Sequence, residues 1–409
     1  MAIARPMRVL TLALCIAILY FLYSLLFGTA STGELRVGKP FDRDPNLDET
    51  TEPEGHLSRV RGNNYAADNP DSDRINAAII SLVRNKELDD ILQSMHDLER
   101  TWNRKFNYPW MFFNDEAFTQ EFMEKTTAAT NAEVTYHMVP AEHWDIPSWI
   151  SEDVMKESAD LLKEKEVQYA HMVSYHQMCR WNSGFFYKHP ALEGIKYYWR
   201  VEPKVHFFCD VDYDVFRYLQ DNNKTYGYTI NLYDSPASIE SLWPETIKFI
   251  SENSRYLSNP NLMDWLNDEE HRPDHYKQAH GYSTCHFWSN FEIADMDFWR
   301  SPAYEAYFEH LDRAGGFFYE RWGDAPVHSI GLGLFLDPSQ IHWFKDIGYQ
   351  HIPFFNCPNS PKCRGCIKGK FTDGESFLNK EDCRPVYHKY FGNEWAPKTK
   401  KTAAIKPPI

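Results

Sequence analysis

The sequence predicts an α/β fold for the folded part of this chain of 409 residues. From about residue 75 onwards, short apolar runs suited to buried strands alternate with amphipathic helical patterns, which is typical of a parallel sheet with crossover helices. Aromatic residues make up 16% of the chain, a share that requires a large packed core. The sequence contains no G-x-G-x-x-G or G-K-[S/T] phosphate loop, so the common dinucleotide-binding and P-loop folds lose their main support.

The pattern begins with an apolar run at 77–83, which predicts a strand. Large apolar residues then recur at three- and four-residue steps across 86–106, which predicts a helix. Three more elements complete the expected order: a strand at 109–113, a helix at 116–127 and a strand at 133–138. Because ligands bind beyond the carboxyl ends of parallel strands, we expect a binding edge near Asn114, Asp115 and Glu116.

An uncharged apolar segment at 9–27 predicts a membrane span. As a helix it would rise about 28 Å, which matches a bilayer core of roughly 30 Å. Arg5 and Arg8 precede it and the first charge after it is Glu34, so the positive-inside rule places the N-terminus in the cytosol and the remaining chain across the membrane. A cleaved signal peptide is the alternative, but its apolar region is usually shorter. We therefore expect a type II signal-anchor.

The anchor divides the chain into further segments. Residues 1–8 form the predicted cytoplasmic tail, and 28–74 form a flexible stem because this stretch is polar, acidic and contains several prolines. Residues 75–396 form the predicted large folded domain. The last segment, 397–409, contains four lysines and is expected to be a loose tail.

The cysteines agree with an oxidising lumen. Four of them lie close together near the C-terminus: Cys357, Cys363, Cys366 and Cys383. This cluster predicts two disulfides that close a loop-rich tail, with three pairings open. A zinc site is the alternative, because two of the four have C-x-x-C spacing. Three more cysteines lie earlier in the chain, at Cys179, Cys209 and Cys285, so at least one of these would stay unpaired if the tail closes on itself.

Two segments present carboxylates in patterns that suit a metal. The run YYWRVEP at 197–203 predicts a strand that ends on Glu202, where a carboxylate could ligate a metal or a substrate hydroxyl. The alternative is an ordinary surface pair between Arg200 and Glu202. Three acids then alternate along the chain: Asp210, Asp212 and Asp214. A D-x-D metal site and a solvated strand or helix start are both open for these acids, whereas the spacing does not fit an EF-hand.

Three aromatic residues surround Glu292 in the run HFWSNFE at 286–292. Burial beside rings would raise the pKa of this acid or hold it against a developing cation. Rings next to an acid are also typical of sugar sites. The alternative is a buried glutamate that its neighbours satisfy. Two later segments, at 320–328 and 346–351, each contain an acid and a histidine that could complete a metal site with Glu202.

Six long segments rich in Trp and Tyr run from the first predicted strands to the second half of the chain. They are KFNYPWMFFNDEAF at 105–118, SYHQMCRWNSGFF at 174–186, YYWRVEP at 197–203, CHFWSNFEIA at 285–294, RSPAYEAYF at 300–308 and GGFFYERWGDAPVHSIG at 315–331. Together they resemble the fungal Golgi α-1,2-mannosyltransferases, glycosyltransferase family 15. The resemblance covers the chain from about residue 75 to the C-terminal cysteines, and runs of this length are highly specific.

The resemblance implies a GT-A-like fold with a mixed central sheet, in a single large lumenal domain behind the membrane anchor. It implies GDP-mannose as donor, Mn²⁺ as cofactor, and transfer with retention of configuration to a mannose 2-hydroxyl. The acceptors it implies are mannose-terminated glycans of glycoproteins, O-linked or N-linked. It also implies a location in the Golgi membrane, with the catalytic domain in the lumen.

The resemblance further assigns roles to single residues. Glu202 and His351 would bind the metal, and Glu292 would be the nucleophile. Asp324 would be a second active-site acid and Tyr175 a group at the donor site. Three residues from the same segments are expected to bind the donor: Arg180, Asn182 and Arg200.

One position departs from the family pattern. The family motif E-P-D carries Lys204 in place of its last acid in this chain. Glu202 remains, but the analogy with a D-x-D motif weakens, and we expect the acids at 210–214 to support the site from behind its direct ligands or to be structural. Retention can proceed through a covalent glycosyl-enzyme on Glu292 or through attack on the same face as the leaving group, and the sequence is compatible with both.

Other functional classes fit parts of the pattern. A glycoside hydrolase would use paired acids such as Glu292 and Asp324 without a nucleotide or Mn²⁺. A membrane-anchored mannan-binding protein would share the aromatic and acidic lining, and transfer of mannose 1-phosphate is another activity within the resemblance. A nucleic-acid partner is not expected, because 58 acidic residues against 43 Lys and Arg give a net charge of -15.

Overall fold

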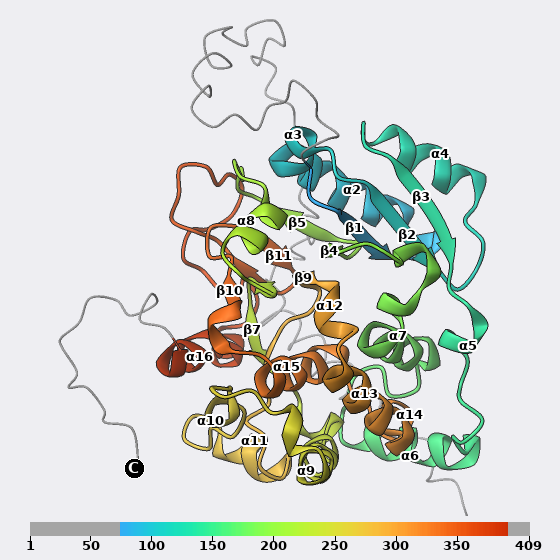
Figure 1. Cartoon of the computed structure of the whole chain (residues 1–409), viewed down its shortest axis with the longest axis vertical. Helices are drawn as coiled ribbons and strands as arrows, with labels where there is room; N and C mark the ends of the chain where they lie inside the picture. The colour runs from blue at the N-terminus through green and yellow to red at the C-terminus, as the bar shows by residue number, and fades with distance from the viewer. Residues whose placement is uncertain (1–73, 392–409) are drawn as a thin grey trace, which may run out of the picture. The chain divides into compact units, whose positions relative to one another are not determined.

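Figure 1 shows a computed structural model of the chain, in which residues 74–391 are described. The predicted anchor at 9–27, the stem up to residue 73 and the tail from residue 397 lie outside the described residues. Within 74–391, no helix combines the length and apolar character that crossing a membrane requires.

A seven-stranded sheet with the order β10-β6-β9-β4-β1-β2-β3 forms the centre of the fold. Its first-half strands run parallel: β1 (Ala77–Leu82), β2 (Trp110–Asn114), β3 (Val134–Met138) and β4 (Tyr197–Val201). These bounds confirm the strands predicted from the apolar runs. Successive residues of β1 belong to different cores, since Ile79 packs in one and Ile80 in the other. The sheet is therefore covered on both faces, as its continuous apolar runs require.

The other half of the sheet makes it mixed, which confirms the expected mixed α/β fold. β9 (Phe291–Asp295) is antiparallel to both of its neighbours, β4 and β6 (Tyr226–Tyr228). β10 (Ile341–Trp343) then pairs in parallel with β6. The insertion of β9 beside β4 brings Glu292 opposite Arg200 in the register of the two strands. Directly opposed residues share a face of the sheet, so the fold itself places these two side chains together.

The helical segment predicted at 86–106 is a succession of helical turns. It consists of η1 (Asn85–Glu87), α2 (Leu88–Leu98), a π-helical turn, η2 (Glu99–Asn103), and α3 (Arg104–Phe106). The next helix, α4 (Gln120–Ala128), begins four residues later than the predicted 116. Its start is fixed by Thr119, whose side chain accepts a hydrogen bond from the Phe122 backbone N–H, the usual role of an N-cap threonine.

The second half of the chain supplies most of the helices. Figure 1 shows α9, α10, α11, α13 and α15 gathered at the bottom of the view, with α2 and α4 at the top. α15 (Asp324–Phe335) is buried from Asp324 to Leu334, as expected for a helix that is largely apolar on every side. The other helices are α5 (Ala141–Trp144), α6 (Glu152–Glu164), α7 (Val173–Gly184), α8 (Val215–Asp221), α9 (Leu242–Glu252), α10 (Met263–Leu266), α11 (Pro273–Gln278), α12 (Met296–Trp299), α13 (Pro302–Ala314), α14 (Gly316–Tyr319) and α16 (Arg384–Phe391).

Two small sheets complete the strands of the described residues. One has the order β12-β11-β5, from β12 (Phe354–Asn356), β11 (Tyr349–His351) and β5 (Val205–Phe207). The other pairs β7 (Asn231–Tyr233) with β8 (Cys285–Phe287). Because β5 follows Glu202 after a short turn and pairs with β11 in antiparallel register, the three-stranded sheet carries His351 to the end of β4.

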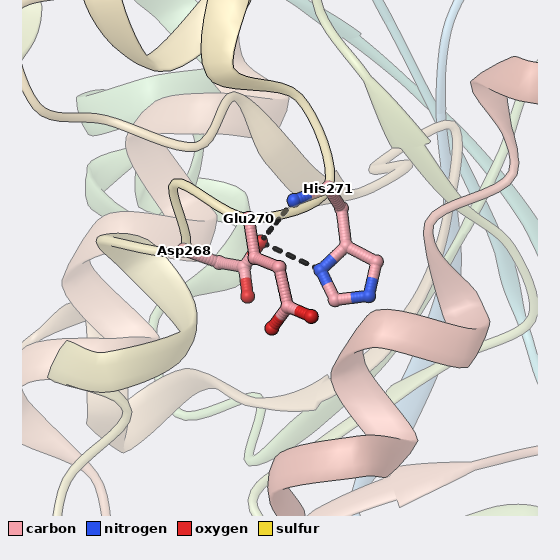
Figure 2. A group of neighbouring side chains, drawn as sticks. All are labelled: Asp268, Glu270 and His271. Carbon is pink, nitrogen blue, oxygen red and sulfur yellow. Dashed lines mark hydrogen bonds and ion pairs between the residues drawn. The ribbon is translucent and has the colours of Figure 1, made fainter.

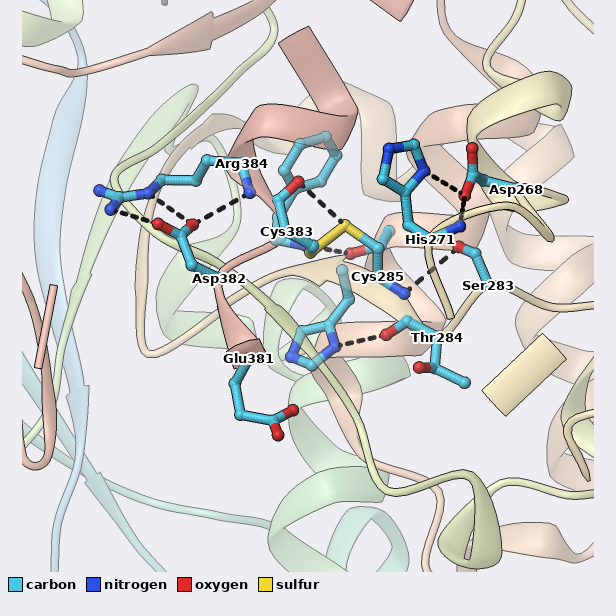
Figure 3. Close-up of a disulfide and its surroundings, with 12 residues drawn as sticks. Asp268, His271, Ser283, Thr284, Cys285, Glu381, Asp382, Cys383 and Arg384 are labelled. Atoms are coloured by element: carbon cyan, nitrogen blue, oxygen red, sulfur yellow. Dashed lines mark hydrogen bonds and ion pairs between the residues drawn. A yellow bond between two sulfur atoms is a disulfide. The ribbon is translucent and has the colours of Figure 1, made fainter. Parts of the chain in front are cut away.

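Three disulfides correct the expected cysteine pairing. Cys357 pairs with Cys366 inside the C-terminal segment, but Cys363 pairs with Cys209, and Cys383 pairs with Cys285 (Figure 3). Disulfides rather than a zinc site are therefore confirmed, whereas the expectation that the four tail cysteines pair only with one another is wrong. The C-terminal segment lies against β7 and the end of β5. It is joined to them by isolated backbone β-bridges, such as the one between Cys209 and Cys363. Within 74–391, the free cysteine is the buried Cys179.

Two of the three alternating acids at 210–214 have structural partners. Asp214 caps α8, because its carboxylate accepts hydrogen bonds from the backbone N–H groups of Phe216 and Arg217. Asp212 pairs with Lys105 at 3.0 Å and with Lys362 at 2.5 Å. The segment is thus a helix start with surface ion pairs, one of the two alternatives left open by the sequence.

Candidate active site

A cavity of about 340 Å³ lies at the carboxyl ends of β1, β2 and β4. Leu82 of β1 and Asn114 of β2 line it, and so do Asp115 and, beyond the end of β4, Glu202. This is the edge at which the sequence predicted a ligand, and its volume falls within the range of small-molecule sites. Glu116, the third residue expected there, hydrogen-bonds Asn85 instead.

Arg200 lies at the centre of a group of three acids. Its Nη1 donates to Asp324 at 2.5 Å and its Nη2 donates to Glu202 at 2.5 Å, while Glu292 lies 4.0 Å away. Burial opposes the charge of this guanidinium, but the surrounding carboxylates raise its pKa. The predicted alternative of a surface pair is therefore wrong, because Arg200 is only 7% exposed. A buried cation that binds several acids fixes their positions relative to one another.

Glu202 and His351 form a pair that fits a divalent cation. Oε2 of Glu202 lies 3.6 Å from Nε2 of His351, and both side chains are partly exposed. Burial alone would raise the pKa of Glu202, but the Arg200 guanidinium and His351 lower it to about 2. Glu202 is therefore a carboxylate at neutral pH. Two ligand atoms that lie about 2.1 Å from one metal are about 3.0 Å apart at a right angle and about 3.6 Å apart at 120°. An oxygen and an imidazole nitrogen at this separation suit Mn²⁺.

Lys204, the departure from the family motif, lies in the short turn between β4 and β5. It has a positive φ of 66° and an exposed side chain. Its backbone N–H donates to the carbonyl oxygen of Asp90. The turn therefore keeps Glu202 at the end of β4 with a lysine in the third position of the motif.

Glu292 is almost fully buried and its carboxylate accepts several hydrogen bonds. The Tyr198 hydroxyl donates to Oε1 at 2.9 Å, and the Tyr226 hydroxyl donates to Oε2 at 3.3 Å. Nδ1 of His328 lies 3.0 Å from Oε2. The alternative of a glutamate satisfied by its neighbours therefore describes its hydrogen bonding. Glu292 also lies beside Arg200, which lines the cavity, but Glu292 does not line the cavity itself.

The hydrogen bonds of His328 locate a proton beside Glu292. Nε2 of His328 lies 3.0 Å from the backbone carbonyl oxygen of Asn182, which can only accept, so Nε2 carries a proton. Nδ1 then faces Oε2 of Glu292 at 3.0 Å, a distance at which two lone pairs would repel. A second proton therefore lies between Nδ1 and Oε2. The two tyrosine hydroxyls and the Arg200 guanidinium also face the Glu292 carboxyl group.

The role of His328 was missed by the assignment of site residues from the sequence. Asp324 and His328 have i, i+4 spacing at the start of α15, and residues with that spacing share one face of a helix. Asp324 also accepts a hydrogen bond from the Ser289 hydroxyl at 2.7 Å. The spacing was the signal that could have joined His328 to the site.

The three other predicted residues have different surroundings. Tyr175 and Asn182 of α7 line the cavity, and the Tyr175 ring stacks on Tyr169 with centroids 4.5 Å apart. Arg180 does not join them. Its guanidinium is buried and donates to both carboxylate oxygens of Asp312, at 2.6 and 2.9 Å. The structure therefore does not support the predicted donor contact of Arg180, because a buried two-point ion pair already holds that side chain.

Cavity residues that the sequence analysis did not select follow β1. Arg84 and Glu87 line the cavity and bind each other at 2.5 Å. Charged residues just beyond a buried strand are typical of ligand-binding edges in such sheets, so their position was the available signal.

A group of acids and a histidine far along the chain resembles a metal site in composition (Figure 2). Asp268, Glu270 and His271 lie together, but each has a partner from the protein. Asp268 accepts hydrogen bonds from His271 and from the Tyr390 hydroxyl, and Glu270 pairs with Lys389 at 2.6 Å. These contacts attach α16 to the segment before α11, which is a structural role.

Comparison with known proteins gives consistent matches along most of the chain. A family model described as glycolipid 2-alpha-mannosyltransferase matches residues 42–392. The chain is 44% identical over 332 residues to the probable mannosyltransferase KTR4 of Saccharomyces cerevisiae, covering 80% of this chain and 71% of that protein. It is 45% identical over 321 residues to the alpha-1,2 mannosyltransferase KTR1 of the same yeast, covering 78% of this chain and 77% of KTR1.

Two solved structures are similar to this one. The Mn/GDP form of core-mannan synthase A (CmsA/Ktr4) from Aspergillus fumigatus has a TM-score of 0.80 and 64% sequence identity, covering 86% of this chain and 94% of that chain. The mannosyltransferase Ktr4p from S. cerevisiae in complex with GDP has a TM-score of 0.77 and 44% identity, covering 78% of this chain and 83% of that chain.

Proposed function

Because the chain belongs to the glycolipid 2-alpha-mannosyltransferase family, we propose that it is a Mn²⁺-dependent retaining α-1,2-mannosyltransferase. It transfers mannose from GDP-mannose to the 2-hydroxyl of a mannose-terminated glycan. The observation that carries the proposal is the arrangement of Glu202 and His351, 3.6 Å apart, next to a cavity that also contains Arg200. The solved structures of two relatives with the same fold contain GDP, and one of these structures also contains Mn.

In this function Glu202 and His351 hold the cation, whose chemistry is to neutralise charge on the departing diphosphate. Arg200 holds Glu202 and Asp324 in fixed positions through its two hydrogen bonds. Tyr175 and Asn182, which line the cavity, are placed to contact the donor. The positions of these side chains are set before substrate binds, so little reorganisation is needed during the reaction.

Glu292 supplies the negative charge that a retaining reaction needs near the anomeric carbon. Its carboxylate is oriented by Tyr198, Tyr226 and His328. The negative charge stabilises an oxocarbenium-like transition state. A carboxylate oxygen of Glu292 could also attack the anomeric carbon and form a covalent glycosyl-enzyme. Both routes use Glu292 in the same place.

The proposal includes a location in the Golgi membrane as a type II protein with a lumenal catalytic domain. The apolar segment at 9–27 and the preceding arginines support the anchor and its orientation. The three disulfides support an oxidising compartment.

A transfer assay tests the function. The purified protein is incubated with GDP-mannose, Mn²⁺ and methyl α-mannoside, and the product is identified by mass and linkage NMR. We expect an α-1,2-linked mannobioside whose formation stops when EDTA removes the metal. Mannose phosphate on the acceptor would instead identify a mannosylphosphate transferase, and binding of GDP-mannose without a product would contradict transfer to this acceptor.

A further inference from the structure

A second cavity, which the proposed reaction does not use, lies beside the three-stranded sheet. Its volume is about 360 Å³, in the range of small-molecule sites. The end of β7 and the loop after it form one wall, and α11, β12 and η8 (Ser376–Glu381) supply the rest. The lining side chains that matter for its chemistry are Tyr233, Asp234, Ser235, His275, Phe354 and Glu381.

One wall of the second cavity lies next to His351 of the metal-binding pair. Phe354 lines the cavity and lies directly opposite His351 in the antiparallel pairing of β11 with β12. Opposed residues of this kind project from the same face, with Cβ atoms about 5 Å apart. The Trp288 ring contacts both side chains, with centroids 4.9 Å from His351 and 5.6 Å from Phe354.

The opposite wall is connected to the first cavity. Asp234 lines the second cavity and accepts a hydrogen bond from Arg321 at 3.3 Å. The Arg321 guanidinium lies over the Tyr175 ring, 5.7 Å from its centroid, and Tyr175 lines the first cavity. Arg321 and Tyr175 are therefore the side chains that stand between the two cavities along this route.

The lining of the second cavity suits an uncharged sugar. The Phe354 and Tyr233 rings offer apolar surface to the C–H groups of a pyranose, and Asp234, Glu381 and the exposed Ser235 hydroxyl can bind its hydroxyls. Two carboxylates disfavour a phosphate or another anion. The nearby cation Arg272 pairs with Glu381 at 3.5 Å and lies over the Tyr233 ring. It therefore offsets part of the negative charge of the two carboxylates, but it is already paired and does not make the cavity an anion site.

We propose that the second cavity binds the mannose residue of the acceptor that precedes the one receiving the new mannose. This inference rests on the proposed function, and it makes the protein prefer an oligosaccharide to a single sugar. The contacts of Trp288 with both His351 and Phe354 place the cavity directly beside the reacting end.

The substitution Ser235→Trp tests the proposal by filling the cavity. Ser235 is exposed, and its side chain does not cap the 3-10 helix, η5 (Pro236–Ser238), that follows, so the fold should tolerate the change. Ser254→Trp, at an equally exposed serine that does not line this cavity, is the matched control. The readouts are kcat/KM for α-1,2-mannobiose and for methyl α-mannoside, and binding of mannobiose to the protein loaded with Mn²⁺ and GDP.

We expect Ser235→Trp to lower kcat/KM for mannobiose by about tenfold or more, the effect of losing one or two sugar hydrogen bonds, while methyl α-mannoside is used as before. Ser254→Trp should change neither value. Equal losses for both acceptors, or no loss for either, would overturn the subsite. If the unsubstituted protein transfers to neither acceptor, the proposed function fails. The binding measurement still decides the subsite in that case, since mannobiose binding that survives Ser235→Trp refutes it and binding that this variant abolishes supports it.

Discussion

Replacing His328 with phenylalanine should destabilise the protein strongly. His328 and Glu292 are paired at 3.0 Å, with side chains 0% and 1% exposed. The substitution keeps an aromatic ring against Trp299, which stacks on His328 with centroids 4.2 Å apart, but it removes both ring nitrogens. The Glu292 carboxylate then loses a buried partner, and the Asn182 carbonyl loses its donor.

The expected magnitude follows from this burial. Removing one partner of a buried pair costs about 3–5 kcal/mol when a carboxylate is left uncompensated. The control is His310→Phe, which breaks a similar pair with Glu245 at 2.9 Å, where the side chains are 19% and 28% exposed. A partly exposed pair of this kind contributes about 1 kcal/mol.

Urea unfolding followed by circular dichroism measures both losses in the free energy of unfolding. The double variant His328→Phe with Glu292→Gln should recover part of the loss, because an uncharged amide costs less to leave without its partner. The reasoning is refuted if His328→Phe costs no more than His310→Phe, or if Glu292→Gln leaves the cost of His328→Phe unchanged.

Three further predictions concern other parts of the molecule. Glu202 has a lowered pKa of about 2 against an ordinary value of 4.5, so its charge stabilises the fold above about pH 4.5 and this contribution is lost as the pH falls towards 2. The free energy of unfolding of Glu202→Gln should therefore depend less on pH across that interval than that of the unsubstituted protein. The same dependence in both proteins would contradict the lowered pKa of Glu202. Arg180→Met should lower the free energy of unfolding, because it leaves the buried Asp312 unpaired. It should leave the KM for GDP-mannose unchanged. A raised KM with normal stability would instead show that Arg180 contacts the donor. Replacing Cys285 and Cys383 by serine removes the bridge of Figure 3, which links positions 98 residues apart, and should cost about 2–4 kcal/mol in urea unfolding; an unchanged midpoint would show that α16 is held by its other contacts.

The sequence predicted the first half of the fold because that half depends on local periodicity. The apolar runs that became β1 and β2 are short, continuous and separated by an amphipathic helix, and such patterns report burial on both faces of a sheet. The predicted start of α4 was four residues too early, because acidic residues upstream of Thr119 also suit the first turn of a helix, while the N-cap is Thr119. A single threonine is a weaker signal than an apolar stripe.

The second half depended on contacts between distant segments, which periodicity does not contain. β9 enters the sheet antiparallel to β4 and places Glu292 opposite Arg200. The sequence of neither strand predicts this pairing. The disulfides of Cys209 and Cys285 cross 154 and 98 residues, so the local crowding of the tail cysteines suggested the wrong partners. The resemblance to the family supplied the residue roles. The structure then showed that Arg180 has a buried partner of its own and that His328 belongs beside Glu292.

The measurement that tests the central claim most directly is the turnover of Glu292→Gln with GDP-mannose, Mn²⁺ and methyl α-mannoside, beside its affinity for GDP. The substitution keeps the shape of the side chain and removes the charge at the centre of the site. We predict that turnover falls by about 100-fold or more, while GDP binding in the presence of Mn²⁺ stays unchanged, because Glu202 and His351 are intact. Near-normal turnover with normal GDP binding would contradict the assignment of Glu292 and the mechanism built on it.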